Sequence, residues 1–342
     1  MDPISQGAVG AAFAQSTAQR ARIRAYALFG ALAGMAPDLD VLIQSPTDPL
    51  LFLEYHRHFT HALLFIPCGA LVLCAVLYRL LPHPLRWREA YLACLVGYAT
   101  HGLLDACTSY GTQLFWPFTD VRVAWNNVSV VDPLATLPLL VCVIMASLRR
   151  RRVWAIAGVS WLCFYLLLGV VQRERAMDSA RALAVSRGHV AERLTVKPGF
   201  ANLLLWKSIY AANGLYYVDG IRAGLPSTVC PGAAVQPFQY AAHAPDLVRT
   251  TQQATDIERF RWFSDDWLAI SSDGFEIGDI RYSMVPNQID PLWTIRMDPR
   301  ADTDAHVDFV SHRRVSGEQT RALLALMVGD ACTELPPAET PS

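Results

Sequence analysis

Residues 24–43 read RAYALFGALAGMAPDLDVLI, an apolar run that the segment 37–40, Pro-Asp-Leu-Asp, interrupts near its end. A helix that crosses a membrane needs roughly 20 mostly apolar residues, and a carboxylate near hydrocarbon needs a partner or a use. We therefore predict a membrane helix that ends near Met35 and is followed by a turn carrying both aspartates. The Gly- and Ala-rich stretch 7–18 is either the first part of this helix or a separate re-entrant or interfacial piece.

The composition changes along the chain. Hydrophobic residues make up 53% of the sequence and charged residues 17%. Residues 1–172 contain 12 arginines, no lysine and 9 acids, whereas residues 173–342 contain 17 basic and 21 acidic residues. We predict an α-helical membrane domain at 1–172, a small, mainly antiparallel β (α+β) extracytoplasmic domain at 173–334, and a disordered tail at 335–342. The net charge of −1 gives no indication of nucleic-acid binding.

Four further apolar runs approach the length of a membrane span, and clusters of arginine alternate with them. Cytoplasmic loops of membrane proteins are enriched in basic residues. With about five spans and a cytoplasmic N-terminus, every arginine cluster lies inside the cell and the C-terminal domain lies outside. The runs are 60–81, 89–107, 131–148 and 153–171, and the clusters are Arg20 to Arg24, Arg79 to Arg88, and Arg149 to Arg152.

Polar residues cluster at the outer ends of the predicted spans. Asp38 and Asp40 follow the first span, the segment 56–61 (His-Arg-His-Phe-Thr-His) leads into the second, and His101 and Asp105 lie in the outer part of the third. The topology was assigned from the arginines alone. The common location of the polar residues is therefore an independent indication that they form one site.

The residue types in this cluster are those that bind divalent metals. His101 and Asp105 are at positions i and i+4, which places both side chains on one helix face. Asp38 and Asp40 cannot share a helix face, so one is expected to bind metal while the other orients a histidine or activates water. Mixed histidine and carboxylate ligands suit Zn²⁺, and also Mn²⁺ or Fe²⁺. The alternatives are a hydrogen-bonded His101–Asp105 pair without metal, a turn role for the aspartates, and an interfacial role for His58.

In order and spacing, these motifs, followed by Gly111-Thr112 and Trp116-Pro117-Phe118, resemble the bacterial membrane-bound metal-dependent hydrolases of the YdjM type. The resemblance covers about residues 25–135. It implies a multi-span inner-membrane protein, whose hydrolase activity is inferred largely from the motifs. The chain departs from the pattern at His58, where such proteins often have glycine, and at Ala62, where serine is common. The functional residues that the resemblance implies are Asp38, Asp40, His56, His61, His101 and Asp105.

A metal held by such residues predicts hydrolysis. A bound divalent cation lowers the pKa of water toward about 7 and polarises a carbonyl or phosphoryl oxygen. The substrates accessible at the outer membrane surface include lipid head groups and lipid-linked intermediates. We therefore predict cleavage of an ester or phosphoester in a membrane lipid, with Asp38 and Asp40 as catalytic residues. The alternative is a non-catalytic membrane protein, in which the cluster is a structural metal site or polar network and the outer domain binds a partner.

In the C-terminal half, aromatic-rich segments separated by Gly, Asn, Asp and Pro predict short strands. A charged helix at 173–187 continues the fifth span, and a helix at 318–329 closes the domain. Cys230 and Cys332 are the only cysteines of this half and are expected to pair in an oxidising compartment. Residues 259–264 alternate with period two, as in a half-buried strand. The predicted strands are 202–210, 214–222, 258–271, 278–284 and 292–297.

Overall fold

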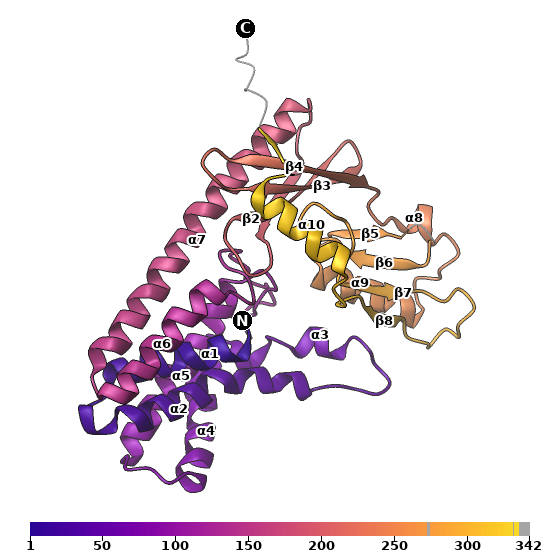
Figure 1. The fold of residues 1–342 in the computed structure, drawn as a ribbon. Helices are drawn as coiled ribbons and strands as arrows, with labels where there is room; N and C mark the ends of the chain where they lie inside the picture. The colour runs from indigo at the N-terminus through magenta and orange to yellow at the C-terminus, as the bar shows by residue number, and fades with distance from the viewer. Residues whose placement is uncertain (272–273, 331, 335–342) are drawn as a thin grey trace. The chain divides into compact units, whose positions relative to one another are not determined.

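The computed structural model describes residues 1–271, 274–330 and 332–334, so the predicted tail at 335–342 lies outside the described residues. The chain forms two compact units. The helical unit consists of Met1–Ile43, Tyr55–Val170 and Phe200–Asn202, and the β unit consists of Gln44–Glu54, Val171–Gly199 and the described residues from Leu203 onward. One long helix, α7 (Arg152–Ser186), contributes residues to both units (Figure 1).

The helical unit contains the segments that carry every predicted ligand. The first predicted span ends at Met35, as expected, and the chain continues as the 3-10 helix η2, which contains Asp38 and Asp40. Besides α7, the helices are α1 (Pro3–Thr17), α2 (Ile23–Met35), α4 (Ile66–Leu80), α5 (Trp87–Ala106) and α6 (Pro133–Arg149), and the 3-10 helices are η1 (Arg20–Arg22), η2 (Ala36–Leu42), η3 (Phe59–His61) and η4 (Leu63–Phe65). The short helix α3 (Leu51–Tyr55) lies between η2 and η3 in the sequence.

The Gly- and Ala-rich stretch near the N-terminus forms a separate helix, α1, and does not continue into α2. Asp2 caps α1 by accepting hydrogen bonds from the backbone N–H groups of Ile4 and Ser5, both at 3.1 Å. A Cβ atom added to Gly10 would lie 2.3 Å from the carbonyl oxygen of Gly30 in α2. Small residues allow such backbone-to-backbone packing of helices. Most of α1 is buried by this packing.

Three described helical segments are long and apolar enough to cross a membrane: Arg20–Leu42, Leu63–Leu80 and Arg152–Ser186. The apolar helix α6 is shorter, at 17 residues. Helix α5 has 20 residues but carries Arg88 and Glu89 near its start and His101 and Asp105 near its end. The helical character of this region is therefore confirmed, whereas the count of five spans stays a prediction.

The β unit contains two antiparallel sheets, which confirms the predicted strand arrangement in outline. One sheet has the order β1-β2-β3-β4-β9, and the other has the order β5-β6-β7-β8 (Figure 1). The strands are β1 (Arg193–Pro198), β2 (Leu205–Ala212), β3 (Leu215–Arg222), β4 (Thr228–Val235), β5 (Leu268–Ile270), β6 (Glu276–Asp279), β7 (Trp293–Arg296), β8 (Asp308–Ser311) and β9 (Thr333–Glu334). The helices are α8 (Tyr240–His243), α9 (Gln252–Phe263) and α10 (Gly317–Val328).

Several boundaries in the β unit were predicted well and others were not. The predicted strands at 202–210, 214–222 and 292–297 correspond to β2, β3 and β7, and the closing helix at 318–329 corresponds to α10. The strand predicted at 278–284 is instead β6, which ends at Asp279. The strands β1, β4, β8 and β9 were not predicted.

The strand predicted at 258–271 is wrong over most of its length, because its first residues belong to helix α9 and only Leu268–Ile270 form a strand, β5. Thr251 caps α9 by accepting a hydrogen bond from the N–H of Ala254. The buried side chains of α9 include Ile257, Phe260 and Phe263, which are three residues apart and so share one helix face. Arginine and aromatic residues alternate in 259–264, which is also the pattern of a half-buried strand. The helical period of the buried residues was therefore not recognised.

The expected pairing of Cys230 with Cys332 is confirmed by a disulfide that joins β4 to the segment after α10. The bridge closes a sequence separation of 102 residues. Loop-closure entropy predicts that a cross-link of this span stabilises the fold by several kcal/mol, on the order of 4. The buried residues Leu205, Val285 and Leu326 pack in the same cluster as Cys230.

Lys207 carries a buried amine in strand β2, and its exposed fraction is only 3%. Its amine donates hydrogen bonds to Ser283 Oγ at 2.8 Å and to the carbonyl oxygen of Gln288 at 2.6 Å. Burial lowers the pKa of Lys207 to about 7. The unfolded chain, in which the lysine pKa is about 10.4, therefore binds more protons between about pH 7 and pH 10, and the free energy of unfolding rises with pH in this range.

We expect Lys207→Met to weaken this pH dependence in the full-length protein. Thermal unfolding at about pH 7 and about pH 10 measures it, since each unit of pKa shift corresponds to about 1.4 kcal/mol. The variant is expected to gain less stability with rising pH than the wild type. Arg321→Met, on the exposed face of α10, is the control and should keep the wild-type slope. An unchanged slope in Lys207→Met would contradict a neutralised buried lysine.

Arg259 in α9 binds the segment 44–54 within the β unit. Its guanidinium contacts both carboxylate oxygens of Asp48, at 3.0 and 2.8 Å, and Glu54 Oε1 at 2.5 Å. It also contacts the fully buried carboxylate of Asp256 at 2.9 Å. The side chain of Phe52 in the same segment meets Phe309 with ring centroids 5.1 Å apart. Arg259 therefore links three carboxylates from two segments that are distant in sequence.

We expect Arg259→Ala to release the segment 44–54, because Asp48 and Asp256 lose their shared cation. The predicted cost is about 2 kcal/mol, less than for a fully buried ion pair because Arg259 is 17% exposed. Hydrogen–deuterium exchange should become faster in 44–54. The matched control is Arg261→Ala on the same helix, since Arg261 pairs only with Glu258 and Asp266 among the described acids. Equal hydrogen–deuterium exchange of the segment 44–54 in both variants would show that Arg259 does not hold this segment in place.

Candidate metal centre

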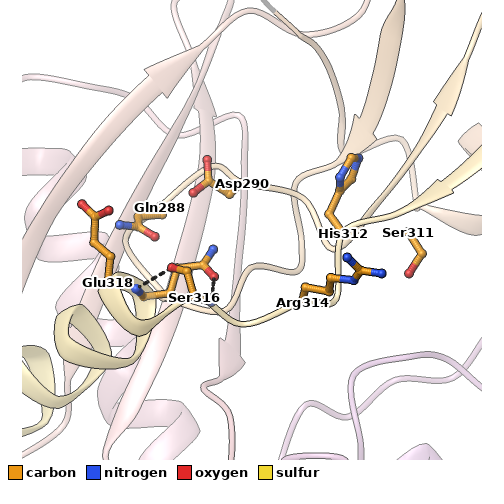
Figure 2. A pocket seen from close by; sticks show the side chains of 8 residues that line it. Gln288, Asp290, Ser311, His312, Arg314, Ser316 and Glu318 are labelled. Atoms are coloured by element: carbon orange, nitrogen blue, oxygen red, sulfur yellow. Dashed lines mark hydrogen bonds between the residues drawn. The ribbon is translucent and has the colours of Figure 1, made fainter.

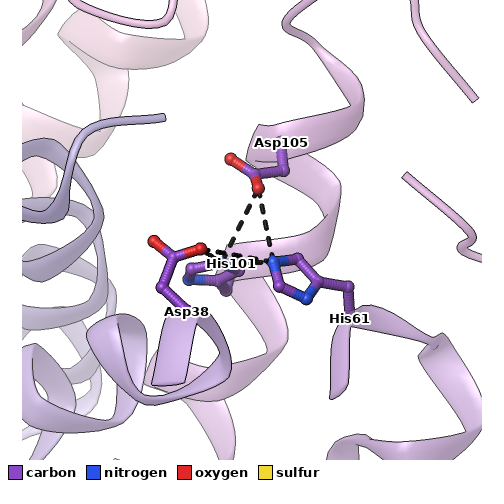
Figure 3. Close-up of side chains that lie close together, drawn as sticks. All are labelled: Asp38, His61, His101 and Asp105. Atoms are coloured by element: carbon purple, nitrogen blue, oxygen red, sulfur yellow. Dashed lines mark hydrogen bonds and ion pairs between the residues drawn. The ribbon is translucent and has the colours of Figure 1, made fainter. Parts of the chain in front are cut away.

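Four side chains of the helical unit converge on one point (Figure 3). They come from three segments: Asp38 from η2, His61 from η3, and His101 with Asp105 from α5. One ligand atom from each lies within 4.8 Å of the ligand atoms of the other three. The side chains of His61, His101 and Asp105 are fully buried, whereas Asp38 is 21% exposed. Asp38 is therefore the only member of this group whose side chain is partly exposed to solvent.

The ring of His101 is oriented by the end of helix α2. Its Nδ1 lies 2.5 Å from the carbonyl oxygen of Gly34, which can only accept a hydrogen bond. The proton of a neutral imidazole is therefore on Nδ1, and Nε2 presents its lone pair to the cluster. This is the arrangement of a metal-binding histidine whose other nitrogen is bonded to a carbonyl or carboxylate.

His61 is oriented in the same way by Asp40. His61 Nδ1 lies 3.2 Å from Asp40 Oδ2 and 3.0 Å from Thr60 Oγ1. Thr60 itself donates its hydroxyl proton to Asp40 Oδ2 at 2.8 Å, so it accepts from His61. The proton of His61 is thereby placed on Nδ1, and Nε2 points at His101 Nε2 at 2.8 Å. In the neutral form of both rings, the lone pairs of the two Nε2 atoms are directed at the same point, which is the arrangement that a cation between them requires.

The four carboxylate-to-histidine spacings fit a tetrahedral cation, whereas the two histidine Nε2 atoms, 2.8 Å apart, would have to separate slightly to bind one. Ligand distances of about 2.0–2.2 Å place neighbouring donors of a tetrahedron about 3.4 Å apart. Asp38 Oδ1 lies 3.5 Å from His61 Nε2 and 3.3 Å from His101 Nε2. Asp105 Oδ2 lies 3.4 Å from His61 Nε2 and 3.7 Å from His101 Nε2. Asp105 Oδ2 is buried beside Arg57 Nε, without the geometry of a hydrogen bond between them. The donor set of two imidazole nitrogens and two carboxylate oxygens fits a divalent metal.

Asp105 is held in place by Arg57, Gln6 and the amino group of Met1, none of which sequence analysis singled out as a site residue. Arg57 Nε lies 2.9 Å from Asp105 Oδ2, and the Arg57 guanidinium also donates to Thr108 Oγ1 at 2.9 Å. Gln6 in α1 donates to Asp105 Oδ1 at 2.8 Å. Arg57 is 4% exposed and Gln6 is fully buried. Two features of the sequence could have pointed to these residues: Gln6 is a glutamine in an apolar helix, and Arg57 lies inside the motif at 56–61.

Asp38, Asp40 and His56 form a second group whose ligand atoms lie within 4.8 Å of one another. His56 Nδ1 lies 2.8 Å from Asp40 Oδ1. Asp40 also accepts a hydrogen bond from the backbone N–H of Arg57 at 3.0 Å, so its two oxygens are fully engaged. The side chain of His56 is 21% exposed. In this arrangement Asp40 orients both His56 and His61, and His56 keeps one ring nitrogen available.

His58 lies outside both groups. Its ring meets those of Trp116 and Tyr55, with centroids 5.2 and 5.5 Å away. The six residues predicted as ligands are thus divided by the structure between two groups that share Asp38, and the additional histidine belongs to an aromatic cluster.

The β unit has a separate hollow of about 730 Å³ beside α10 (Figure 2). Its lining includes Asp290, His312, Arg314 and Glu318, which carry charges of both signs. His312 bonds to Thr294 Oγ1 at 3.2 Å and lies 3.4 Å from Glu276. Among the described residues, both groups with metal-binding geometry lie in the helical unit, and none lies in this hollow.

Apolar helices of membrane-spanning length and a buried His/Asp cluster define a membrane protein with a candidate metal centre. Residues 1–176 match the family described as YdjM inner membrane protein, and the chain belongs to that family. It is similar to the protein YfhP of Bacillus subtilis, described as uncharacterized, with 25% identity over 145 residues. That match covers 41% of this chain and 41% of the length of YfhP. No solved structure matches the chain.

We expect the exchange Asp38→Asn to remove most of the stabilisation that a divalent metal gives. Ligands that bind only the folded state raise the midpoint of thermal unfolding. The detergent-solubilised wild type should shift upward on addition of Zn²⁺ or Mn²⁺, and Asp38→Asn should shift by less than half as much. Asp120→Asn is a matched control with the same charge change at an exposed position. Equal shifts in all three proteins would exclude metal binding by Asp38.

Proposed function

We propose that this protein is a metal-dependent hydrolase that cleaves an ester or phosphoester of a membrane lipid. The observation that carries the proposal is the pair of histidine lone pairs and two carboxylate oxygens directed at one point. His61, His101, Asp105 and Asp38 hold the cation, with Zn²⁺ favoured by the mixed donor set and Mn²⁺ or Fe²⁺ as further candidates. When bound, such a metal polarises the scissile carbonyl or phosphoryl group and acidifies water.

The pair His56–Asp40 supplies the proton transfer in this proposal. Asp40 is buried and bonded to His56 Nδ1, which leaves Nε2 to accept a proton. His56 takes a proton from the attacking water, whose oxygen forms the new bond to carbon or phosphorus. The bond to the leaving alcohol breaks, and His56 returns the proton to that alcohol. Asp38 lies beside this pair and helps to position the ester or phosphoester group of the lipid.

The surroundings of Asp38 favour a lipid substrate. Leu39 is 61% exposed and Leu42 is 74% exposed, and both lie in η2 beside the aspartates. An apolar surface next to a polar site suits a molecule with an acyl or isoprenoid chain and a polar head group. The arginine distribution supports an extracytoplasmic site, with the N-terminus in the cytoplasm and the β unit outside.

The proposal can be tested with purified protein in detergent. Metal content is measured by elemental analysis, and hydrolysis is measured on a panel of ester and phosphoester lipids. His101→Ala should lose both bound metal and activity. His56→Asn should keep bound metal but lose about 100-fold or more in kcat, because a general base contributes on that order. His58→Ala is the control from the same segment and should retain metal and most activity.

Two outcomes would contradict the proposal in different ways. Absence of bound metal from the wild type, with no effect of added metal on thermal stability, would exclude the metal centre. Bound metal without turnover of any lipid, combined with unfolding of His101→Ala, would favour the alternative of a structural metal site. Catalysis requires an open coordination position, which a closed structural site lacks.

A further inference from the structure

Four arginines from two distant parts of the helical unit line one hollow of about 650 Å³. Arg20 belongs to the 3-10 helix η1 after α1, Arg150 and Arg151 connect α6 to α7, and Arg152 is the first residue of α7. Arg150 adopts a left-handed conformation with φ of 50°, which ends α6 and allows the chain to reverse. The arginines therefore meet because two chain turns lie next to each other.

Buried and backbone contacts hold these turns together. Gln15 near the end of α1 is fully buried and donates to Ser147 Oγ at 2.8 Å and to the carbonyl oxygen of Val143 at 3.3 Å. Arg24 Nε donates to the carbonyl oxygen of Ser147 at 3.0 Å. Gln15 in α1 and Arg24 in α2 thus link the chain on both sides of Arg20 to the end of α6.

No carboxylate pairs with these four arginines among the residues that the structure describes. In contrast, the nearby Arg22 pairs with Glu89 of α5. Four guanidinium groups around one hollow repel one another unless an anion lies between them. Guanidinium groups bind phosphate oxygens through paired N–H donors, so the expected ligand contains phosphate.

The position of the hollow indicates which kind of phosphate-containing molecule binds there. Val153 lines the hollow and is 58% exposed, and it begins the apolar segment of α7 that is long enough to cross a membrane. Leu148 and Ile156 on the neighbouring turns are 63% and 46% exposed. Basic pockets at the ends of membrane helices suit anionic head groups, because the acyl chains then cover the adjoining apolar surface. We propose that this hollow binds the phosphate of an anionic phospholipid.

The test compares lipid binding by full-length wild type and the variant Arg20→Gln/Arg151→Gln/Arg152→Gln. Arg150 is retained because of its backbone conformation. Binding is measured in detergent by thermal stabilisation with phosphatidylglycerol, phosphatidylcholine or inorganic phosphate. We expect phosphatidylglycerol alone to stabilise the wild type, with affinity weakened at least about tenfold in the variant, because three of the four cations that would bind the phosphate are removed.

A charge-matched control variant is Arg79→Gln/Arg88→Gln/Arg149→Gln, which removes three exposed arginines outside the hollow. It should bind phosphatidylglycerol like the wild type. Equal loss in both triple variants would show a general effect of surface charge and would overturn the site. Equal stabilisation by inorganic phosphate would also overturn it in favour of a free anion. These outcomes are independent of the proposed hydrolase, since neither variant changes a residue of the metal centre.

Discussion

Backbone-to-backbone packing against helix α2 is the constraint on which the helical unit depends. Gly10 of α1 and Gly97 of α5 both approach Gly30 so closely that an added Cβ would lie 2.3 and 2.4 Å from its carbonyl oxygen. This proximity brings the carbonyl oxygen of Gly34 to His101 and the amide of Gln6 to Asp105. The orientation of the candidate metal ligands is therefore a consequence of how closely three helices approach.

The same packing creates an electrostatic cost at the site. Asp40 and Asp105 are almost fully buried, and burial of an unpaired carboxylate is strongly unfavourable. Asp40 is compensated by donors from Arg57, Thr60 and the neighbouring histidines. Asp105 pairs with Arg57 and with the amino group of Met1, and it accepts a hydrogen bond from Gln6. Its Oδ2 also lies 3.4 and 3.7 Å from the Nε2 atoms of His61 and His101, so the same carboxylate takes part in the charge balance of the helical unit and in the candidate metal centre.

Much of the helical region could be predicted from the sequence, because long apolar runs and arginine clusters are local signals. The end of α2 at Met35 followed from the proline and aspartates after it. The β unit was harder to predict. Arg259 and Arg261 alternate with aromatic residues and imitate a strand, yet the buried face of Ile257, Phe260 and Phe263 makes the segment a helix. Contacts with distant segments, such as that of Arg259 with Asp48, are not visible in a local pattern.

By itself, the sequence determined which residue types are available for a metal centre and their order along three segments. Side-chain chemistry and spacing are sufficient for that, since histidines and aspartates next to apolar runs need a use or a partner. Only the tertiary structure decided their separate roles. Hydrogen bonds from His101 to Gly34 and from His61 to Asp40 join residues 67 and 21 positions apart, and these bonds determine which ring nitrogen faces the cluster. A proton position of this kind depends on the partner across the helix interface, and no local sequence pattern contains that partner.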